Sequence, residues 1–416
     1  MKRSESQVVL GLRENWKQFS LLVVINGFVG AMIGLERSIF PQFASEVFGL
    51  ESKVAILSFI VAFGISKAAA NYFSGKLANN LGRKNLLILG WIIALPVPLI
   101  LAFTGSWNWV IASNILLGMS QGLTWSSTVV MKIDLVGEKD RGFAMGLNEF
   151  AGYFAVGVFA FLSGYLAQEF GIRPYPFLLG EIIALLGLLL TFLFVKDTRK
   201  HVEMEAGKHS ETSMKGIFWE TTFRNKTLSS ITQAGLVNNL NDGMIWGLLP
   251  VLLVSLQFEL DQVGLIAAIY PTVWGISQLF TGKMADIFPK KALLFWGMLI
   301  QGIAILILPL AAGYPLLIII SVSLGIGTAI VYPTFLAAIA EATHPRQRAE
   351  SIGTFRLWRD LGYAVGAVLS GITADIFGIK SAIIFIGLIT IASSLVIQGR
   401  MPKRIKFQEV NELEHT

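Results

Sequence analysis

The segment Gly75–Asn79 reads Gly-Lys-Leu-Ala-Asn, and the segment Gly282–Asp286 reads Gly-Lys-Met-Ala-Asp. The two segments lie 207 residues apart. The same shift pairs further residues along the chain: Lys84 with Lys291, Gly118 with Gly325, Asp134 with Glu341, Arg141 with Arg348, Gly146 with Gly353 and Gly171 with Gly378. The same 207-residue shift applies in both polar and apolar segments, which is hard to obtain by chance. The sequence therefore predicts two copies of one structural unit that follow each other along the chain.

The composition indicates that this unit lies in a membrane. Of the 416 residues, 54% are hydrophobic and 14% are charged, whereas soluble domains carry about 25% charged residues. So little charge leaves too little polar surface to face water, and a lipid bilayer is the natural solvent. The chain has no cysteine, which excludes disulfides, thiolate metal sites and a cysteine nucleophile.

Apolar runs of about 20 residues, the length that crosses a bilayer, recur from one end of the chain to the other. We place twelve: Phe19–Phe40, Lys53–Gly75, Asn85–Phe103, Trp107–Val130, Gly142–Gln168, Tyr175–Lys196, Leu228–Leu252, Gln262–Gly282, Lys291–Leu310, Tyr314–Ala338, Glu350–Ile372 and Lys380–Gln398. The predicted fold is an all-α polytopic membrane protein with twelve transmembrane helices in two pseudo-symmetric six-helix bundles. The bundles occupy residues 1–196 and 228–400, with a cytoplasmic linker at 197–227 and a cytoplasmic tail at 401–416.

The basic residues predict the orientation. With both termini inside, 26 of the 33 Lys and Arg residues, among them Lys132, fall in predicted cytoplasmic segments, and only Lys53, Arg173 and Lys380 fall in segments on the outer side. Such an excess is the positive-inside rule, and it supports an even number of helices in the cytoplasmic (inner) membrane. The basic charge is spread over seven separate segments, which makes nucleic-acid binding the poorer interpretation.

The repeated segment carries a family resemblance. The run Gly75–Lys84 resembles the signature loop between the second and third helices of the major facilitator superfamily, and Gly282–Asp286 resembles its second copy. The resemblance implies alternating access between two rocking halves, with a polar latch on the cytoplasmic side. The expected latch residues are Gly75, Asn79, Gly82, Arg83, Arg141, Gly282, Asp286 and Arg348. The alternative is that these residues only fix short turns.

The sequence departs from the family pattern in three places. Asn79 replaces the usual aspartate, and Asn114 stands where many proton-coupled members have an arginine. The segment Asn148–Tyr153 lacks the Gly-Pro-x-x-Gly-Gly pattern of drug/proton antiporters. These differences weaken an assignment to drug efflux.

Eight ionisable residues fall inside the predicted helices, where a charge costs at least about 2.5–3.5 kcal/mol and marks a functional candidate. They are Glu36, Arg37, Lys67, Glu149, Asp242, Arg356, Arg359 and Asp360. Arg359 and Tyr363 are four residues apart, as are Glu149 and Tyr153, so each pair shares a helix face. The repeat places these two clusters at equivalent positions, where a central cavity is expected.

We expect an anionic or zwitterionic solute to meet the basic residues of this set. The predicted binding residues are Arg359, Arg356, Lys67, Arg37, Asp242, Asn238 and Tyr363. The predicted proton carriers are Glu149, Asp360 and Glu36, with Asp242 as an alternative, because a desolvated carboxylate can exchange protons near neutral pH. The alternatives are structural salt bridges for the ions and polar contacts between helices for Asn238.

The sequence therefore predicts a secondary active transporter for a small polar or charged organic solute, coupled to protons, with export slightly favoured by a general resemblance to efflux permeases. The alternatives are an organic-anion exchanger or uptake symporter and, more distantly, a non-transporting membrane receptor or enzyme. The sequence has no phosphate-binding loop and no intramembrane cluster of metal ligands, so we expect no enzyme activity and no cofactor. The expected partners are the solute, protons and the lipid bilayer, and the expected functional unit is a monomer.

Overall fold

The computed structural model of the protein describes residues 9–136, 141–201, 216–311, 313–343 and 348–403. These residues form helices and connecting turns, and none of them lies in a strand. The first half contains α1 (Trp16–Arg37), α2 (Phe40–Phe48), α3 (Lys53–Leu81), α4 (Arg83–Ala94), α5 (Pro96–Phe103), α6 (Trp107–Val136), α7 (Arg141–Phe170) and α8 (Tyr175–Phe194). The second half contains α10 (Ile217–Trp219), the π-helical turn Glu220–Arg224, α11 (Lys226–Ser255), α12 (Leu260–Ile287), α13 (Lys290–Ile307), the 3₁₀ turn Leu308–Leu310, α14 (Tyr314–Ala342), α15 (Arg348–Phe377) and α16 (Ile379–Arg400).

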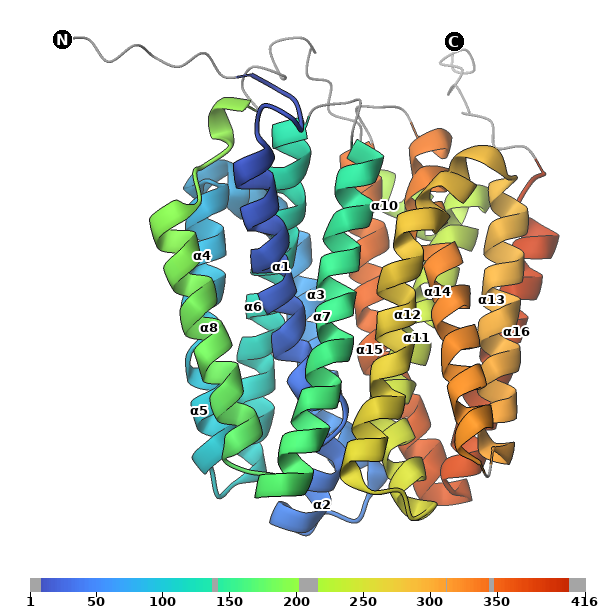
Figure 1. The fold of residues 1–416 in the computed structure, drawn as a ribbon. Helices are drawn as coiled ribbons and strands as arrows, with labels where there is room; N and C mark the ends of the chain where they lie inside the picture. Colours follow the sequence, from blue (N-terminus) through green and yellow to red (C-terminus); the bar gives the residue numbers. More distant parts are fainter. Residues whose placement is uncertain (1–8, 137–140, 202–215, 312, 344–347, 404–416) are drawn as a thin grey trace.

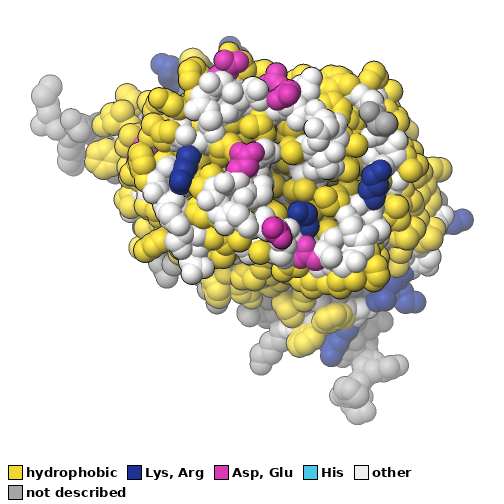
Figure 2. Space-filling model, turned by 90° about the horizontal axis from the view of Figure 1, so that it is seen from below, with side chains coloured by type: hydrophobic (Ala, Val, Ile, Leu, Met, Phe, Trp, Pro, Cys, Tyr) yellow, Lys and Arg dark blue, Asp and Glu magenta, His cyan; other side chains and the backbone are white. Residues whose placement is uncertain are grey.

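The long helices run side by side as one bundle, with the first half on the left of Figure 1 and the second half on the right. The start of α1 and the end of α16 lie at the same end of the bundle, and the short helix α2 lies at the opposite end (Figure 1). We call the face that carries α2 the distal face. Figure 2 looks onto the distal face and shows hydrophobic side chains over most of it, with isolated Lys, Arg, Asp and Glu side chains.

Among the described residues, ten helices or joined helix pairs are long and apolar enough to cross a membrane. Two more, α6 and α11, have 30 residues each and are therefore about 45 Å long. They are less hydropathic because Asn, Ser, Thr and Gln replace apolar residues inside them, and many of these polar side chains are buried. An interior helix faces other helices rather than lipid, so it needs less hydropathy. The number of twelve spans stays a prediction.

Several boundaries differ from the predicted ones for local reasons. The third predicted span is two helices that meet at Leu95, because Pro96 and Pro98 follow. The first predicted span ends at Arg37, and α2 continues it after a short break. Helix α6 extends to Val136 rather than Val130, so Lys132, predicted to lie in a cytoplasmic loop, is instead fully buried inside a helix.

The repeat is visible in the helices and in their contacts. The starts of α3, α4, α6 and α7 differ from the starts of α12, α13, α14 and α15 by the same 207 residues. An ion pair repeats as well. Arg83 Nε lies 3.3 Å from Asp134 Oδ2, and the equivalent pair, Lys290 Nζ and Glu341 Oε2, is 2.7 Å apart. Each pair joins two helices of its own half.

The two halves meet along α3 with α15 and along α7 with α12. Glycines allow these helices to approach closely. A Cβ at Gly157 of α7 would lie 1.9 Å from Thr272 Oγ1 of α12, and a Cβ at Gly371 of α15 would lie 3.0 Å from Val54 Cα of α3. Neither glycine tolerates a side chain without displacing the opposite helix.

Side chains from the end of one half also cap helices of the other half near the distal face. Asp375 of α15 accepts hydrogen bonds from the backbone N–H groups of Lys53 and Val54 at the start of α3. Gln168 of α7 accepts a hydrogen bond of 3.2 Å from the N–H of Leu260 at the start of α12. The two caps are related by the 207-residue shift. They satisfy helix N–H groups that have no partner within their own helix, and they fasten the halves together at the distal face.

These contacts predict that Gly157→Ala destabilises the interface between α7 and α12. Overpacking of this kind costs about 1–3 kcal/mol, whereas Gly353, also inside a helix, has no atom within 4 Å of an added Cβ. We expect Gly157→Ala to lower the Tm of the purified protein and Gly353→Ala to leave it unchanged or raise it. Equal Tm values for the two variants would contradict the close approach of α7 and α12.

Candidate solute-binding site

A small polar cavity lies between the two halves. Its lining residues come from α3, α6 and α7 of the first half and from α14 and α15 of the second: Lys67, Asn71, Trp125, Ser126, Glu149, Tyr153, Tyr332, Arg356, Arg359 and Asp360. The cavity volume is about 30 Å³, which holds about one water molecule. An organic solute therefore needs the halves to separate before it can enter.

Helical periodicity explains why these side chains converge. Lys67 and Asn71, Glu149 and Tyr153, and Arg356 and Asp360 are each four residues apart on one helix, so each pair projects from one face. Glu149 and Arg356 are also equivalent under the 207-residue shift. The same position of the two repeats thus contributes a carboxylate in one half and a guanidinium in the other.

Arg359 has unused hydrogen-bonding capacity in this cavity. Its side chain is buried, its guanidinium lies 4.4 Å from the ring centroid of Tyr332, and its Nη1 is 3.7 Å from Asp360 Oδ1. Its Nε and Nη2 have no hydrogen-bond partner in the described part of the chain. Buried polar groups are nearly always paired, so these donors mark a place for an acceptor that the protein itself does not supply.

Asp360 is also hydrogen-bonded to the first half. Asn71 Nδ2 donates to Asp360 Oδ2 over 2.6 Å, and Ser126 Oγ donates to Asn71 Oδ1 over the same distance. This chain of hydrogen bonds runs from α6 through α3 to α15. It orients the carboxylate of Asp360 and leaves Arg359 only partly neutralised.

Lys67 is a second buried cation of the cavity. Its Nζ lies 5.3, 5.7 and 5.1 Å from the ring centroids of Phe63, Trp125 and Tyr363. Among the described residues no carboxylate lies within 4 Å of this ammonium group. Aromatic faces attract a cation, but they do not neutralise it.

Glu149 is the carboxylate of the cavity in the first half. Its Oε1 accepts hydrogen bonds from Trp125 Nε1 at 3.1 Å and Asn148 Nδ2 at 3.0 Å. No described residue donates a hydrogen bond to its Oε2. Lys132, the buried residue that was expected in a loop, does not line this cavity and donates to the carbonyl oxygen of Leu22 over 3.3 Å.

Arg37 and Asp242, two of the predicted binding residues, form a buried ion pair between the halves. Arg37 Nη1 and Nη2 donate to the two carboxylate oxygens of Asp242 over 2.7 and 2.9 Å. The guanidinium of Arg37 also lies 4.7 Å from the ring centroid of Trp246. The pair joins α1 to α11 outside the small cavity, and each charge already has its partner.

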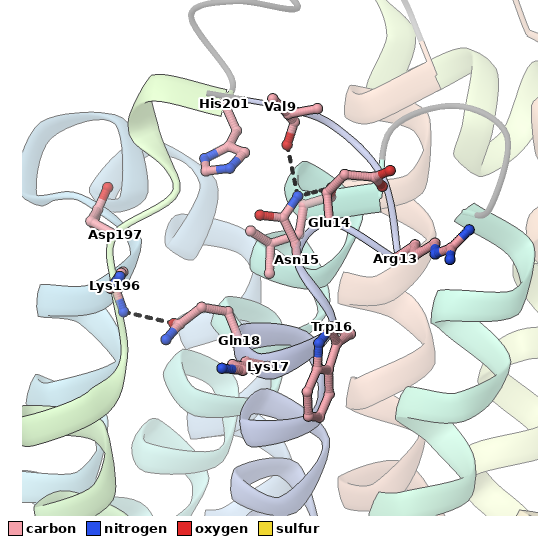
Figure 3. A pocket seen from close by; sticks show the side chains of 11 residues that line it. Val9, Arg13, Glu14, Asn15, Trp16, Lys17, Gln18, Lys196, Asp197 and His201 are labelled. Atoms are coloured by element: carbon pink, nitrogen blue, oxygen red, sulfur yellow. Dashed lines mark hydrogen bonds between the residues drawn. The ribbon is translucent and has the colours of Figure 1, made fainter. Parts of the chain in front are cut away.

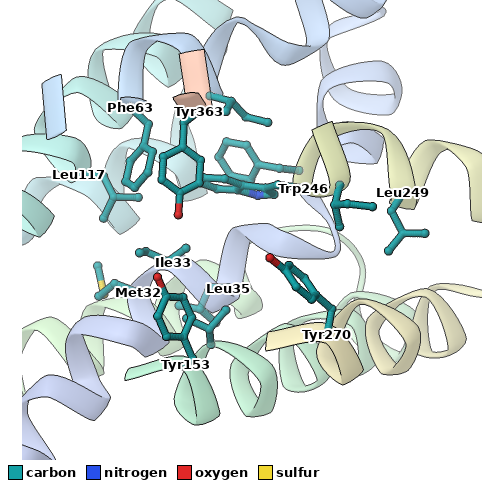
Figure 4. Close-up of a cluster of buried hydrophobic side chains, with 14 of the residues drawn as sticks. Met32, Ile33, Leu35, Phe63, Leu117, Tyr153, Trp246, Leu249, Tyr270 and Tyr363 are labelled. Atoms are coloured by element: carbon teal, nitrogen blue, oxygen red, sulfur yellow. The ribbon is translucent and has the colours of Figure 1, made fainter. Parts of the chain in front are cut away.

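Aromatic and aliphatic side chains separate this ion pair from the cavity. Figure 4 shows the hydroxyl groups of Tyr153, Tyr270 and Tyr363 turned toward a shared space, with Ile33 and Trp246 beside them. The Tyr363 ring contacts both Phe63 and Trp246. Tyr363, predicted to bind the solute, therefore stands between the ion pair and Lys67.

Two other residues of the predicted site lie outside the small cavity. Asn238 donates to Gln301 Oε1 of α13 over 2.9 Å, which is the polar contact between helices that was the alternative for it. Glu36 is buried, and neither of its carboxylate oxygens has a hydrogen-bond partner among the described residues. It does not line the cavity.

Three of the predicted latch residues can be placed. Gly82 has a φ of 85° and begins the turn into α4, a conformation that favours glycine. Arg83 pairs with Asp134, which also accepts a hydrogen bond of 2.6 Å from Thr198. Gly282 lies within α12 and has no atom within 4 Å of an added Cβ. The surroundings of Gly75 and the side chains of Asn79, Arg141, Asp286 and Arg348 lie outside the described residues.

A larger cavity, of about 630 Å³, lies around the start of α1, at the end of the bundle opposite the distal face. Figure 3 shows His201 and Asp197 on one side of it and Asn15 and Gln18 on the other, with the Lys196 N–H donating to Gln18 Oε1 over 2.9 Å. Its lining residues belong to the first half, apart from Asp197 and His201 at the start of the predicted linker, and none of them belongs to the second half. A site within one half does not change access when the halves rock, so we do not assign the solute to it.

The buried ion pair predicts a distinctive pattern of stability. Arg37→Met or Asp242→Leu alone leaves one buried charge without a partner, which costs about 3–5 kcal/mol. The double variant removes both charges, so its loss of Tm should be smaller than the sum of the two single losses. Thermal unfolding of the four proteins measures this coupling, and additive losses would show that the two residues do not depend on each other.

Comparisons with known proteins agree with the fold. The profile of the Major Facilitator Superfamily matches residues 19–236 and 231–415. The multidrug resistance protein MdtG of Proteus mirabilis is 22% identical over 407 residues, which cover 94% of this chain and 98% of that protein. The proton-coupled antiporter flippase LtaA of Staphylococcus saprophyticus is 23% identical, with 81% of each chain covered.

Solved structures share the arrangement of helices at low sequence identity. A POT family transporter in complex with a thioalcohol-conjugated peptide superposes with a TM-score of 0.73 at 15% identity, covering 92% of this chain and 95% of that one. The human organic anion transporter MFSD10 superposes with a TM-score of 0.67 at 17% identity, covering 92% and 99%. This likeness concerns the fold alone. Together with the repeat and the profile match, it shows that this chain belongs to the Major Facilitator Superfamily of membrane transport proteins.

Proposed function

We propose that the protein is a secondary active transporter that carries a small organic anion together with a proton. The observation that carries the proposal is Arg359, whose Nε and Nη2 are buried without a partner among the described residues, in a cavity between the two halves. Burying an incompletely neutralised guanidinium is costly. A carboxylate supplied by a solute would neutralise it with two parallel hydrogen bonds.

The charges around the cavity support an anion. Lys67, Arg356 and Arg359 face it, against the carboxylates of Glu149 and Asp360. With all five groups charged, the cavity carries one net positive charge. In a medium of low dielectric constant this excess attracts an anion more strongly than it would in water.

The proposal requires alternating access between two six-helix bundles, residues 1–196 and 228–400, in twelve spans. The caps at Asp375 and Gln168 join the halves at the distal face, so we infer that the halves separate at the opposite face to admit the solute. We infer from the basic residues that this face is cytoplasmic and that the membrane is the cytoplasmic membrane.

Glu149 is the proposed proton carrier, and electrostatics predicts the direction of coupling. Protonation of Glu149 removes one of the two carboxylates at the cavity and so strengthens anion binding. By linkage, a bound anion strengthens proton binding to the same degree. The proton and the anion would therefore cross together.

A second candidate function is proton-driven export of cationic or neutral amphiphiles. It is favoured by relatives whose names denote multidrug resistance and efflux, such as MdtG and the PmrA homolog of Lactococcus lactis. Such a solute would compete with the proton for Glu149, and proton and solute would cross in opposite directions. The sign of solute-induced proton movement in reconstituted vesicles separates the two functions.

Arg359→Ala should abolish uptake of organic anions by vesicles. The loss of a buried partner for a charged group costs about 2–5 kcal/mol, so affinity should fall by at least about 30-fold. Arg400→Ala is the matched control, because Arg400 is exposed at the end of α16 and contacts only the backbone oxygen of Phe223 among the described residues. Wild-type anion transport by Arg359→Ala would remove Arg359 from the site.

Glu149→Gln should bind the anion at high pH about as tightly as wild type does at low pH, because glutamine mimics the protonated carboxyl group. The variant should lose the decrease in anion affinity that wild type shows as pH rises. Anion affinity measured across a pH series in detergent tests this expectation. A wild-type pH profile in the variant would assign the proton to another group.

A further inference from the structure

Four aromatic rings form a row across the two halves, with a cation at each end. The ring centroids of Trp125 and Tyr153 are 5.3 Å apart, those of Tyr153 and Trp274 are 3.5 Å apart, and those of Trp274 and Tyr332 are 6.3 Å apart. Lys67 lies over Trp125 at one end, and Arg359 lies over Tyr332 at the other. Trp125 and Tyr153 belong to the first half, and Trp274 and Tyr332 belong to the second.

Trp274 is the second-half equivalent of a residue that lines the cavity. The 207-residue shift relates it to Lys67, just as it relates Tyr332 to Trp125. Lys67, Trp125 and Tyr332 all line the cavity. Trp274 was not among the residues predicted from the sequence, although the shift applied to Lys67 points to it.

The indole of Trp274 has an unused donor. Its side chain is 1% exposed, and its Nε1 has no hydrogen-bond partner in the described part of the chain. A buried N–H without a partner costs about 1–3 kcal/mol. An acceptor from a bound solute would recover this free energy.

The stacked pair at the centre of the row crosses the interface that must open. Tyr153 of α7 and Trp274 of α12 stack with an interplanar angle of 26°. Carbon atoms in contact prefer a separation of about 3.5–4 Å, so a planar ring placed between them requires roughly twice the present distance. Separation of the halves would expose one face of each ring and leave a slot for a planar aromatic group.

We propose that Tyr153 and Trp274 form an aromatic clamp that selects an aryl carboxylate, with the ring between them and the carboxylate on Arg359. This inference rests on the proposed function, because it names the class of anion that the same cavity takes. The Tyr332 ring lies between Trp274 and Arg359 and sets the distance between the ring slot and the cation. Trp274 Nε1 donates to an oxygen of the solute.

Benzoate and cyclohexanecarboxylate test the clamp, because the two acids share size and charge and differ in the aromatic ring. Stacking of one aromatic pair predicts a preference of wild type for benzoate of about 2- to 10-fold in Kd. Titration calorimetry on the purified full-length protein in nanodiscs measures both constants. A wild-type ratio near one would overturn the clamp.

Trp274→Leu should bring the ratio of the two constants close to one while binding of both acids still depends on Arg359. Trp274→Phe keeps an aromatic face and loses the N–H, so it should retain the preference for benzoate and bind both acids more weakly. Trp91→Leu is the matched control. Trp91 is equally buried with an Nε1 that has no partner among the described residues, but it packs against Gly187 within the first half, and its loss should leave the ratio unchanged.

The outcomes distinguish the clamp from the proposed function. If both acids bind wild type, bind Arg359→Ala at least about 30-fold more weakly, and show no preference for the ring, the anion site stands and the clamp is wrong. An unchanged ratio in Trp274→Leu likewise overturns the clamp and leaves the anion site standing. If neither acid binds wild type, the clamp for aryl carboxylates fails, and the proposed function is then decided by vesicle transport of other anions.

Discussion

A charge buried between two bundles of apolar helices needs a partner, and this constraint governs the centre of the protein. Arg37 and Asp242 satisfy each other across the interface of the halves. Asp360 is satisfied by Asn71 of the opposite half. Arg359 keeps two unpartnered donors in the described structure, and Lys67 is surrounded by aromatic rings instead of carboxylates. These partly unpaired cations are energetically unfavourable, and they lie together at one place. In the proposed function, a bound anion neutralises them.

The repeat explains how such a place arises. Where the two copies keep the same chemistry they build structure: Arg83 with Asp134 and Lys290 with Glu341 hold helices within each half, and Asp375 and Gln168 cap helices across the distal face. Positions at which the two copies carry different residues lie at or beside the cavity. Glu149 corresponds to Arg356, Lys67 to Trp274 and Trp125 to Tyr332. Five of these six residues line the cavity, so the differences between the copies place one carboxylate, two cations and two aromatic rings around the same space. Trp274 stacks on Tyr153, which also lines it.

Much of the fold and of the cavity could be predicted from the sequence, because charged residues are rare in membrane-spanning segments and are easily recognised there. The ten apolar spans, the repeat, the family and the convergence of Lys67, Glu149, Arg356, Arg359 and Asp360 all follow from hydropathy, spacing and the 207-residue shift. The pairing of Arg37 with Asp242 did not follow, because it depends on how α1 and α11 meet. Lys132 was misplaced because polar residues near the end of α6 resemble a loop when their helix neighbours are unknown. Trp274 was missed because an aromatic residue in an apolar helix carries no signal of its own.

Arg359 holds the central place in the proposed mechanism, as the residue that binds the charged group of an organic anion in the cavity between the halves. A structure of the protein with 4-iodobenzoate, located by the anomalous scattering of iodine, tests this role most directly. We expect the carboxylate within hydrogen-bonding distance of Arg359 Nε and Nη2, with the iodinated ring between Tyr153 and Trp274. An anion bound at another place, with the Arg359 guanidinium still unpartnered, would contradict the proposed role.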